Sequence, residues 1–396
     1  MEQSRQSIAE DEANYQNAKS TRWLHINGNA SVQTQYETRI NSDTSYNNVT
    51  FGPYASVYAS QPVFHWGEFD ARNAQARNRV AASKGWAEQR ACQIRQDVRH
   101  NFIEYQLAVQ SAAIAQDSIA YARRKQQGLQ ELLNRGLASK EDLLEADIFA
   151  QERQEDLDYA LNQLAFNLDL LRETTGQSAL KISTADFPQM QTLSDGELNE
   201  LRVAAASAHL PSITAMEGEL AAEEAAYKEI RTRNLPKINA VVSGNLDTVD
   251  EYRNGGNYAN VPRMYAWAGI QANWTLYDSG SNDADKLACI ARQRRIKARI
   301  DEARMAQNRD TANIARDASL NASRYETRLR RLELLKSTVA LMEAQLELHA
   351  VPVNDLLQRK LDLQRTQLEL VRANAYYMLD IAQLRELASY GVSVSK

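Results

Sequence analysis

The chain has 396 residues, 43% of them hydrophobic, and a formal net charge of −5 from 46 basic and 51 acidic side chains. This nearly balanced charge gives no sign of a nucleic-acid partner, and no basic cluster indicates a membrane-surface anchor. The sequence contains no run of 18 apolar residues that would form a transmembrane helix, and its polar N-terminus is unlike a signal peptide.

An internal repeat with a period of about 213 residues organises the sequence. Landmarks recur in the same order with one residue of slip, which indicates a duplication with a period far too long for a solenoid. The matching segments are Gly136–Glu173 with His349–Glu386, Gly67 with Gly280, and, at a shift of 212, Ile26-Asn27 with Ile238-Asn239.

The first repeat is predicted over residues 1–174. A short helical stretch leads into strands at about 23–37 and 51–64, where apolar and polar residues alternate from Leu24 to Gln35. Residues 67–135 contain no proline and predict a long helix of roughly 100 Å. Gly136 ends this helix and Ser139 caps a returning helix over 139–174.

The second repeat, residues 200–388, follows a linker at 175–199 and has the same plan. It predicts a helix over 200–233, strands at about 236–248 and 263–277, a long helix over 281–348 and a returning helix over 354–388. Residues 389–396 form a tail. The fold class is therefore mainly α with a small β part, in a two-repeat protomer of long coiled helices and four strands.

The four strands suit a membrane but cannot cross one alone. Each is long enough for a transmembrane β-strand, which needs about 9–11 residues. The aromatic residues Tyr54, Tyr58, Tyr265 and Trp267 are candidates for the girdle at the membrane interface. Because open sheet edges do not stand in lipid and the smallest common barrels have about 8 strands, several copies have to share one barrel.

Three passages carry a resemblance to a known family, whose landmarks occur in the family's order in both repeats. They are the strand-to-helix passage QPVFHWGEFDARNAQARNRV, the turn NRGLASKEDLLEAD and the helix-to-strand passage LPSITAMEGELAAEEAAYKEIRTRNLPKINAVVSGN. The chain resembles the TolC family of outer-membrane efflux proteins. This resemblance implies a homotrimer with a 12-strand β-barrel in outer-membrane lipid and a 12-helix α-barrel in the periplasm.

The resemblance also implies a function. Family members form passive exit ducts for efflux or type I secretion, working with a periplasmic adaptor and an inner-membrane pump. They begin with a signal peptide and an opening helix. Here the counterpart of Gly196–Ser212 is missing ahead of residue 1, so we expect the sequence to be shortened at its start.

Acidic residues near the helical turns are candidates for a pore constriction. Asp355 lies where the family places a ring of acidic side chains, and an acidic ring attracts cations. Gln358 stands where the family has a second acid, which puts the second ring in doubt. Asp142 and Glu145 are the weaker candidates of the first repeat. The alternative for Asp355 is a simple preference of acids for a helix N-terminus.

The two turns are candidates for docking the adaptor. Gly136, Leu137 and Ser139 form the first tip, and Val351 and Pro352 belong to the second, which lacks the glycine. Ordinary turn chemistry, a Gly C-cap followed by a Ser N-cap, also explains the first tip.

No catalytic or cofactor motif stands out. The five histidines share no metal-ligand spacing, and there is no phosphate-binding loop or nucleophile elbow. We therefore expect no metal, no cofactor and no enzymatic activity. The alternative function is a soluble trimeric coiled-coil protein with a structural or tethering role, which accounts for the helices but not for the strands.

Overall fold

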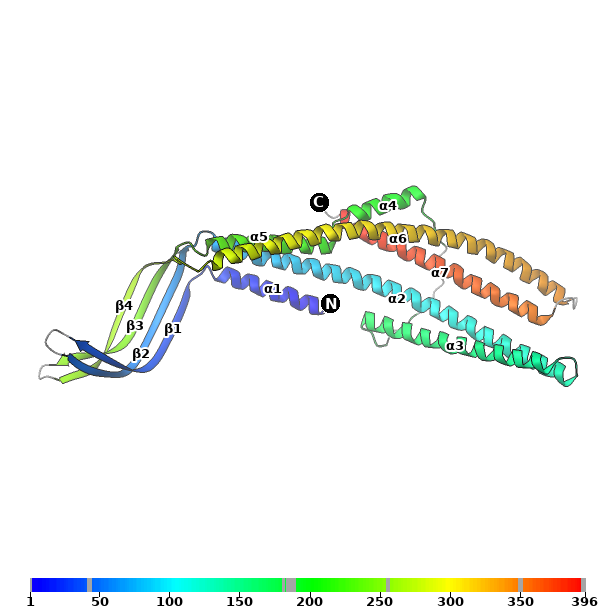
Figure 1. Ribbon diagram of the computed structural model, residues 1–396, viewed down its shortest axis with the longest axis horizontal. Coiled ribbons are helices and arrows are strands. Elements are labelled where there is room, and N and C mark those ends of the chain that lie inside the picture. The colour runs from blue at the N-terminus through cyan, green and yellow to red at the C-terminus, as the bar shows by residue number, and fades with distance from the viewer. Residues whose placement is uncertain are drawn as a thin grey trace. The chain divides into compact units, whose positions relative to one another are not determined.

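The computed structural model describes residues 2–40, 45–179, 182, 190–253, 257–347 and 352–392. Within them the chain forms seven helices and four strands (Figure 1). In chain order these are α1 (Glu2–Ser20), β1 (His25–Ile40), β2 (Ser45–Phe64), α2 (Glu68–Asn134), α3 (Lys140–Thr175), α4 (Asp195–Ser207), α5 (Pro211–Thr232), β3 (Lys237–Arg253), β4 (Asn257–Asn273), α6 (Ser281–Glu347) and α7 (Val353–Val392).

The chain divides into two compact units. The first is Met1–Ala87 with Ser212–Glu302, and the second is Glu88–Pro211 with Ala303–Lys396. The first unit holds the sheet with α1, α5 and the beginnings of α2 and α6. The second holds the rest of α2 and α6 with α3, α4 and α7. Neither repeat is a compact unit by itself, because each unit takes one part of each repeat.

The duplication is confirmed in the backbone. α2 and α6 contain 67 residues each, and both their first residues (281 − 68) and their last residues (347 − 134) are 213 positions apart. The two residues at the turn before each helix share a left-handed conformation. Trp66 and Ser279 both have φ +56°, and Gly67 and Gly280 both have φ +82°. Glycine adopts a positive φ at little steric cost, which explains why it recurs in this turn.

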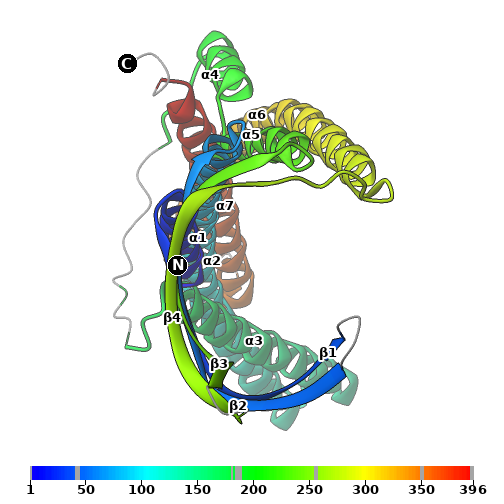
Figure 2. The ribbon, with the colours of Figure 1, turned by 90° about the vertical axis from the view of Figure 1, so that its left-hand side faces the viewer.

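The strands form one antiparallel sheet in the order β1-β2-β3-β4, and Figure 2 shows it as strongly curved. β1 and β2 are longer than side-chain alternation predicts, since they pair as far as Ile40 and Ser45. Ladder hydrogen bonds join backbones, so polar side chains do not end a strand that has a partner opposite. β4 ends at Asn273, short of 277, because Trp274 leaves the ladder and donates its indole N–H to the Asn234 carbonyl at 3.0 Å.

The helix predicted over 200–233 is interrupted between α4 and α5. Pro211, the first residue of α5, has no N–H and disfavours a helical conformation in the residue before it, so a helix does not run through this point. The side-chain amide of Gln307 donates to the freed carbonyls of Ala205 and Ala208, at 2.8 and 2.9 Å. The break is therefore stabilised by α6 of the same unit.

In the first unit, α2 and α5 approach closely at two reciprocal contacts between small residues. A Cβ atom on Gly85 would lie 2.9 Å from the backbone nitrogen of Ala215. A Cβ atom on Gly218 would lie 3.0 Å from the backbone nitrogen of Ala82. Both distances are shorter than ordinary van der Waals contact, so the spacing of the two helices depends on these glycines.

In the second unit, side-chain contacts arrange four helices in the order α3, α2, α7, α6. The apolar centre of this layer is Ile103 and Leu107 of α2 with Ala375 of α7. The contacts between neighbouring helices include Asn101 with Thr174 (α2 to α3, 2.8 Å), Asp117 with Gln364 (α2 to α7, 2.6 Å) and Arg328 with Glu369 (α6 to α7, 3.0 Å). α3 and α6 are thus the outer helices of the layer.

The close contact of α2 and α5 predicts opposite effects for two glycine substitutions in α2. Gly85→Ala forces the helices apart, so we expect it to lower the free energy of unfolding by about 1–3 kcal/mol, as overpacking does. Gly128→Ala is the control, because nothing lies within 4 Å of its added Cβ. Its better helix propensity stabilises by about 0.5–1 kcal/mol. Thermal unfolding followed by circular dichroism measures the stability of both variants. Equal changes in stability would contradict the close contact.

Candidate functional site

The sheet has one apolar and one polar face. On the central strand β3, Val242 is 55% exposed on the apolar face, whereas its neighbours Val241 and Ser243 on the other face are only 2% and 5% exposed. Side chains crowd on the inside of a curved sheet, so the apolar face is the convex one. Its members include Ile26, Val32, Ala55, Val57, Val242, Leu246, Met264 and Ile270, which the strand register places side by side.

Both edges of the sheet are open. Within the described residues, β1 pairs only with β2, and β4 pairs only with β3. An edge strand presents a row of unpaired backbone N–H and C=O groups that can pair with another strand. The sheet therefore offers a lipophilic surface and two sites for strand addition.

The four aromatic residues predicted for the membrane girdle lie on the polar, concave face. The Tyr58 hydroxyl donates to Gln271 at 3.0 Å, and the Arg263 guanidinium lies over the Tyr265 ring at 5.2 Å. Tyr54 and Trp267 share the alternation of Tyr58 and Tyr265. Successive side chains in a strand point to opposite faces, and the prediction weighed only closeness to the strand ends. The membrane-interface role of these four residues stays a prediction, and their side chains lie on the face opposite to the apolar one.

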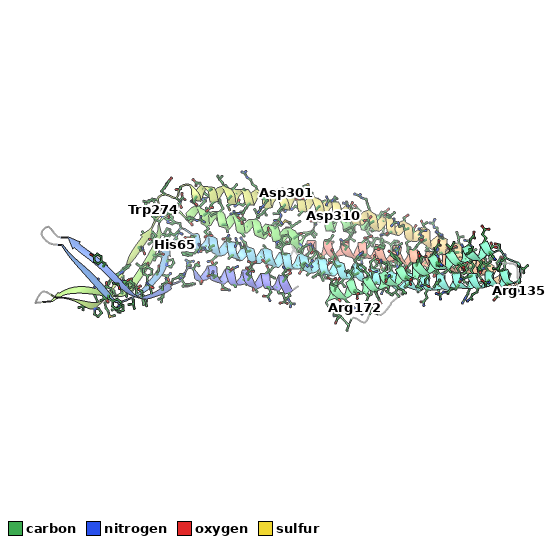
Figure 3. The ribbon with its side chains drawn as sticks, turned by 60° about the horizontal axis from the view of Figure 1, so that its bottom comes forward. His65, Arg135, Arg172, Trp274, Asp301 and Asp310 are labelled. Carbon is green, nitrogen blue, oxygen red and sulfur yellow. The ribbon has the colours of Figure 1, made fainter. Side chains whose placement is uncertain are left out.

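Three exposed tryptophans lie at the helix-side ends of the strands, and sequence reasoning missed two of them, Trp23 and Trp274. Trp23, Trp66 and Trp274 are 69%, 46% and 61% exposed. Figure 3 shows Trp274 at the junction of strands and helices, with His65 at the same level. Their signal in the sequence is their position, within two residues of the ends of β1, β2 and β4.

A buried ionic cluster surrounds Glu68 where β2 passes into α2. Glu68 is 7% exposed, and its carboxylate lies 2.8 Å from Lys237 Nζ, 3.2 Å from His65 Nδ1 and 3.2 Å from Arg72 Nη2. His65 Nε2 also lies 2.9 Å from Asn239 Oδ1. Burial alone would raise the pKa of Glu68, but the hydrogen bonds and positive charges around it hold the pKa below its usual value. The cluster ties β3 to the start of α2.

Backbone and side-chain caps shape the turn between α2 and α3. Gly136 has φ +73°, and the N–H groups of Gly136 and Leu137 donate to the carbonyls of Leu133 and Leu132 at 2.9 and 2.8 Å. This is the Schellman pattern of a glycine-terminated helix. Ser139 is the N-cap of α3. Leu137 is 72% exposed, so the turn presents an apolar side chain to the surroundings.

The candidate acids have different environments. Asp142 accepts hydrogen bonds from the backbone N–H and the hydroxyl of Ser139, at 2.9 and 2.8 Å, and the backbone bond holds its pKa below the usual value. The carboxylate of Asp142 is therefore engaged in a cap. Glu145 and Asp355 are exposed. Burial and the charge of Asp355 raise the pKa of Tyr121, which indicates that α2 and α7 adjoin there.

The second tip is described only in part. Val351 lies outside the described residues. Pro352 is exposed, directly precedes α7 and accepts the backbone N–H of Asp355 at 3.1 Å. Adaptor docking at either tip and the constriction role of Asp355, Asp142 and Glu145 stay predictions.

The outer helices of the second unit carry exposed apolar residues. On α3 these residues are 58–66% exposed, and on α6 they are 65–69% exposed. They are Leu144, Ile148, Tyr159 and Phe166 of α3, and Leu334 and Leu341 of α6. These exposed apolar residues on the two outer helices can pack against further helices.

The described residues contain neither a membrane-spanning helix nor a cluster of metal ligands. None of the helices there is long and apolar enough to cross a membrane. Among the same residues, no group of three histidine, cysteine or acidic side chains is placed to hold a metal ion.

Comparisons with known proteins agree with the resemblance. Residues 1–177 match the model of the outer membrane efflux protein family. No curated protein sequence gave a match. Three similar solved structures each cover 98% of this chain: outer membrane protein VceC from Vibrio cholerae (TM-score 0.74, 13% identity, 92% of that chain), the Campylobacter jejuni CmeC outer membrane channel (0.75, 11%, 82%) and the open state of the Neisseria gonorrhoeae MtrE outer membrane channel (0.72, 15%, 86%).

The Glu68 cluster predicts a pH-dependent contribution to stability. A carboxylate whose pKa is lowered by folding stabilises the fold above its unfolded pKa, near 4.5, and that stabilisation is lost as the pH falls through the folded value. Glu68→Gln leaves Lys237 and Arg72 without the buried charge and should cost about 3 kcal/mol at pH 7. The difference from the wild type in thermal unfolding should shrink below pH 4.5.

The matched control is Asp283→Asn. Asp283 pairs with Lys286 on the surface of α6 and its side chain is 80% exposed. An exposed pair contributes about 0–1 kcal/mol, so this variant should melt close to the wild type. An equal loss of thermal stability in both variants would show that the Glu68 cluster contributes no more than an exposed ion pair.

Proposed function

We propose that this chain, whose residues 1–177 match the outer membrane efflux protein family, is the protomer of a trimeric outer-membrane exit duct. The observation that carries the proposal is the curved sheet with an apolar convex face and two open edges. In lipid every backbone polar group has to be satisfied within the protein. Copies joined from β4 to β1 would satisfy both edges and enclose the polar face.

The number of copies comes from the resemblance to the family. Three protomers with four strands each give a barrel of 12 strands, which is within the size range of outer-membrane barrels. A heterologous contact, in which β4 of one copy meets β1 of the next, generates a ring when the rotation closes. The concave face, with Tyr58, Tyr265 and Arg263, would then line a polar lumen.

The helical layer supports the same kind of assembly. Its outer helices α3 and α6 both carry exposed apolar side chains, and long helices need neighbours that cover such faces. Contact between α3 of one copy and α6 of the next would repeat the head-to-tail order of the sheet. Twelve long helices would then form the periplasmic α-barrel below the membrane.

Function as an exit duct implies partners. A passive duct needs a periplasmic adaptor and an inner-membrane pump, and the tips at Gly136–Ser139 and Pro352 are the surfaces we assign to adaptor contact. Leu137, 72% exposed on a well-capped turn, offers an apolar contact there. The same architecture would serve the exit of small molecules or of secreted proteins.

The rival function, a soluble coiled-coil tether, fits the sheet poorly. A soluble protein rarely exposes a large contiguous apolar patch without a partner for it. Here that patch extends across all four strands, and Met264 and Ile270 are 83% and 79% exposed.

Disulfide cross-linking across the proposed β4–β1 contact tests the assembly. In a variant without the native free cysteines Cys92 and Cys289, Ser31→Cys in β1 is combined with a cysteine at one of five positions in β4. These positions are Arg263, Tyr265, Trp267, Gly269 and Gln271, which share the concave face with Ser31. Oxidation in membranes should give dimers and trimers on denaturing gels for at least one pair.

The control places the β1 cysteine at Ala30, on the opposite face, with the same five partners. It should give little cross-linked product, because its side chain points away from theirs. Monomers from all five Ser31 pairs would exclude the shared barrel. A protein that stays in solution without detergent would favour the tether.

The constriction role of Asp355 predicts a change in ion selectivity. If three copies of this exposed acid face the duct, Asp355→Asn removes an acidic ring and should lower the cation-over-anion permeability ratio by at least about twofold. The variant and the wild type are compared by reversal potentials in planar lipid bilayers. Asp142→Asn is the comparison variant, since the carboxylate of Asp142 is engaged by Ser139. Unchanged selectivity in the Asp355 variant would show that this residue does not form the constriction.

A further inference from the structure

The concave face of the sheet carries aromatic rings in two columns. Tyr54 and Tyr58 lie on β2, and Tyr265 and Trp267 lie on β4. β3 separates these strands, so the two columns are about 10 Å apart, which is twice the spacing of neighbouring strands. All four residues belong to the first unit, and together they are called the aromatic strip below.

Side chains of β3 close the floor between the two columns. The Tyr58 hydroxyl donates to Gln271 on β4 at 3.0 Å, so the Tyr58 side chain crosses β3. Val241 and Ser243, which lie beneath this crossing, are only 2% and 5% exposed. The face therefore offers rings and polar side chains to a ligand, while the middle of β3 is covered.

Two members of the aromatic strip keep a polar group available. Trp267 is 46% exposed, and its indole N–H has no hydrogen-bond partner among the described residues. The hydroxyl of the partly buried Tyr54 has none among them either. An aromatic ring with a free donor at its edge can contact an apolar surface and a polar group of the same ligand.

Amide side chains surround the rings. Asn27 and Asn29 are exposed on β1, where Asn27 lies directly opposite Tyr58. Asn245 of β3 lies opposite Tyr265, and its amide donates to the Ser243 hydroxyl at 3.0 Å. A side-chain amide can both donate and accept hydrogen bonds. The rings are thus flanked by groups that suit a ligand with many hydroxyls.

The charges at this level of the face cancel. Arg263 and Asp247 form a bidentate pair with distances of 3.2 and 2.8 Å, and the Arg263 guanidinium also lies over the Tyr265 ring at 5.2 Å. From Asn27 to Ser31 on β1 and at the positions paired with them on β2, the polar side chains are uncharged. The face therefore has no unpaired charge there to recognise an ionic ligand.

We propose that the aromatic strip binds a neutral oligosaccharide chain. The C–H faces of the sugar rings would pack on Trp267 and Tyr54, and the sugar hydroxyls would bond to the free donors and the flanking amides. A few polar groups placed among aromatic rings are typical of a binding site for a small neutral ligand. The site rests on the proposed function, since the concave face lines a lumen only when copies close the barrel.

Ion-current recording in planar lipid bilayers tests the site, with maltohexaose as the probe. In the reconstituted wild type, maltohexaose should interrupt the current in proportion to its concentration. Trp267→Leu removes an aromatic ring, so we expect the blocking constant to weaken about threefold to tenfold. Trp267→Phe keeps a ring face and should retain most of the block. Tyr54→Leu is the second test of a ring, in case Trp267→Leu does not assemble.

The control for the loss of a ring is Phe51→Leu. Phe51 is 62% exposed and lies opposite Thr34 on the convex face, so this variant should be blocked like the wild type. The control for size is a polyethylene glycol of the same mass as maltohexaose, which should block less. Caffeine, an uncharged planar aromatic compound, tests the other class of neutral ligand.

Four outcomes would overturn the oligosaccharide site. They are a conducting wild type that maltohexaose does not block, an equal block by polyethylene glycol, an unchanged block in both Trp267→Leu and Tyr54→Leu, and a block by caffeine in place of maltohexaose. In each case the conductance itself shows that the protein is a duct, so the proposed function stands and only the ligand site fails.

A protein that does not conduct would contradict the proposed function, and tryptophan fluorescence then tests the site. The full chain is kept in a detergent without a sugar headgroup, because an alkyl maltoside would compete with the probe. Maltohexaose should change the emission of the wild type and leave that of Trp267→Leu unchanged. The absence of any change in the wild type would overturn the site.

Discussion

The unpaired backbone of the two outer strands is the constraint on which the rest of the structure depends. A sheet that is apolar on its convex face has to meet lipid or protein, and in lipid an open edge leaves N–H and C=O groups without partners. One copy cannot remove this cost, since the curvature does not bring β1 and β4 together within four strands (Figure 2). Joining copies edge to edge removes it, and the apolar margins of α3 and α6 then gain neighbours as well.

The junction between strands and helices is where the two repeats agree in backbone and differ in side chains. The left-handed turn at Trp66-Gly67 is repeated at Ser279-Gly280, so the conformation itself is what the passage from strand to helix requires. On this shared frame the first repeat adds the Glu68 cluster, which ties α2 to β3 through Lys237. The exposed Trp66 and Trp274 stand where the other repeat has Ser279 and Gln61. A comparison of equivalent positions therefore separates the residues that the turn requires from those that have another role.

At the turn between α2 and α3, the polar groups of the first tip are already bonded to one another. The carboxylate of Asp142 is bound by Ser139, and the turn is fixed by the positive φ of Gly136 and the backbone hydrogen bonds that Gly136 and Leu137 donate. A capped turn of this kind is rigid without a partner, and Leu137 is the side chain it leaves available. Asp355, in contrast, is exposed in the first turn of α7. The two acids, which occupy equivalent positions in the two repeats, thus differ in what binds them.

The sequence by itself determined the duplication, the two long helices and the four strands. These follow from local patterns: alternation in strands, the absence of proline over a long stretch and the recurrence of landmarks at 213 residues. Only the tertiary structure decided which face each aromatic residue occupies, because register and curvature arise from pairing between strands far apart in the chain. It also decided the partners of Glu68 and of the Trp274 indole, since each depends on a contact that no local pattern encodes.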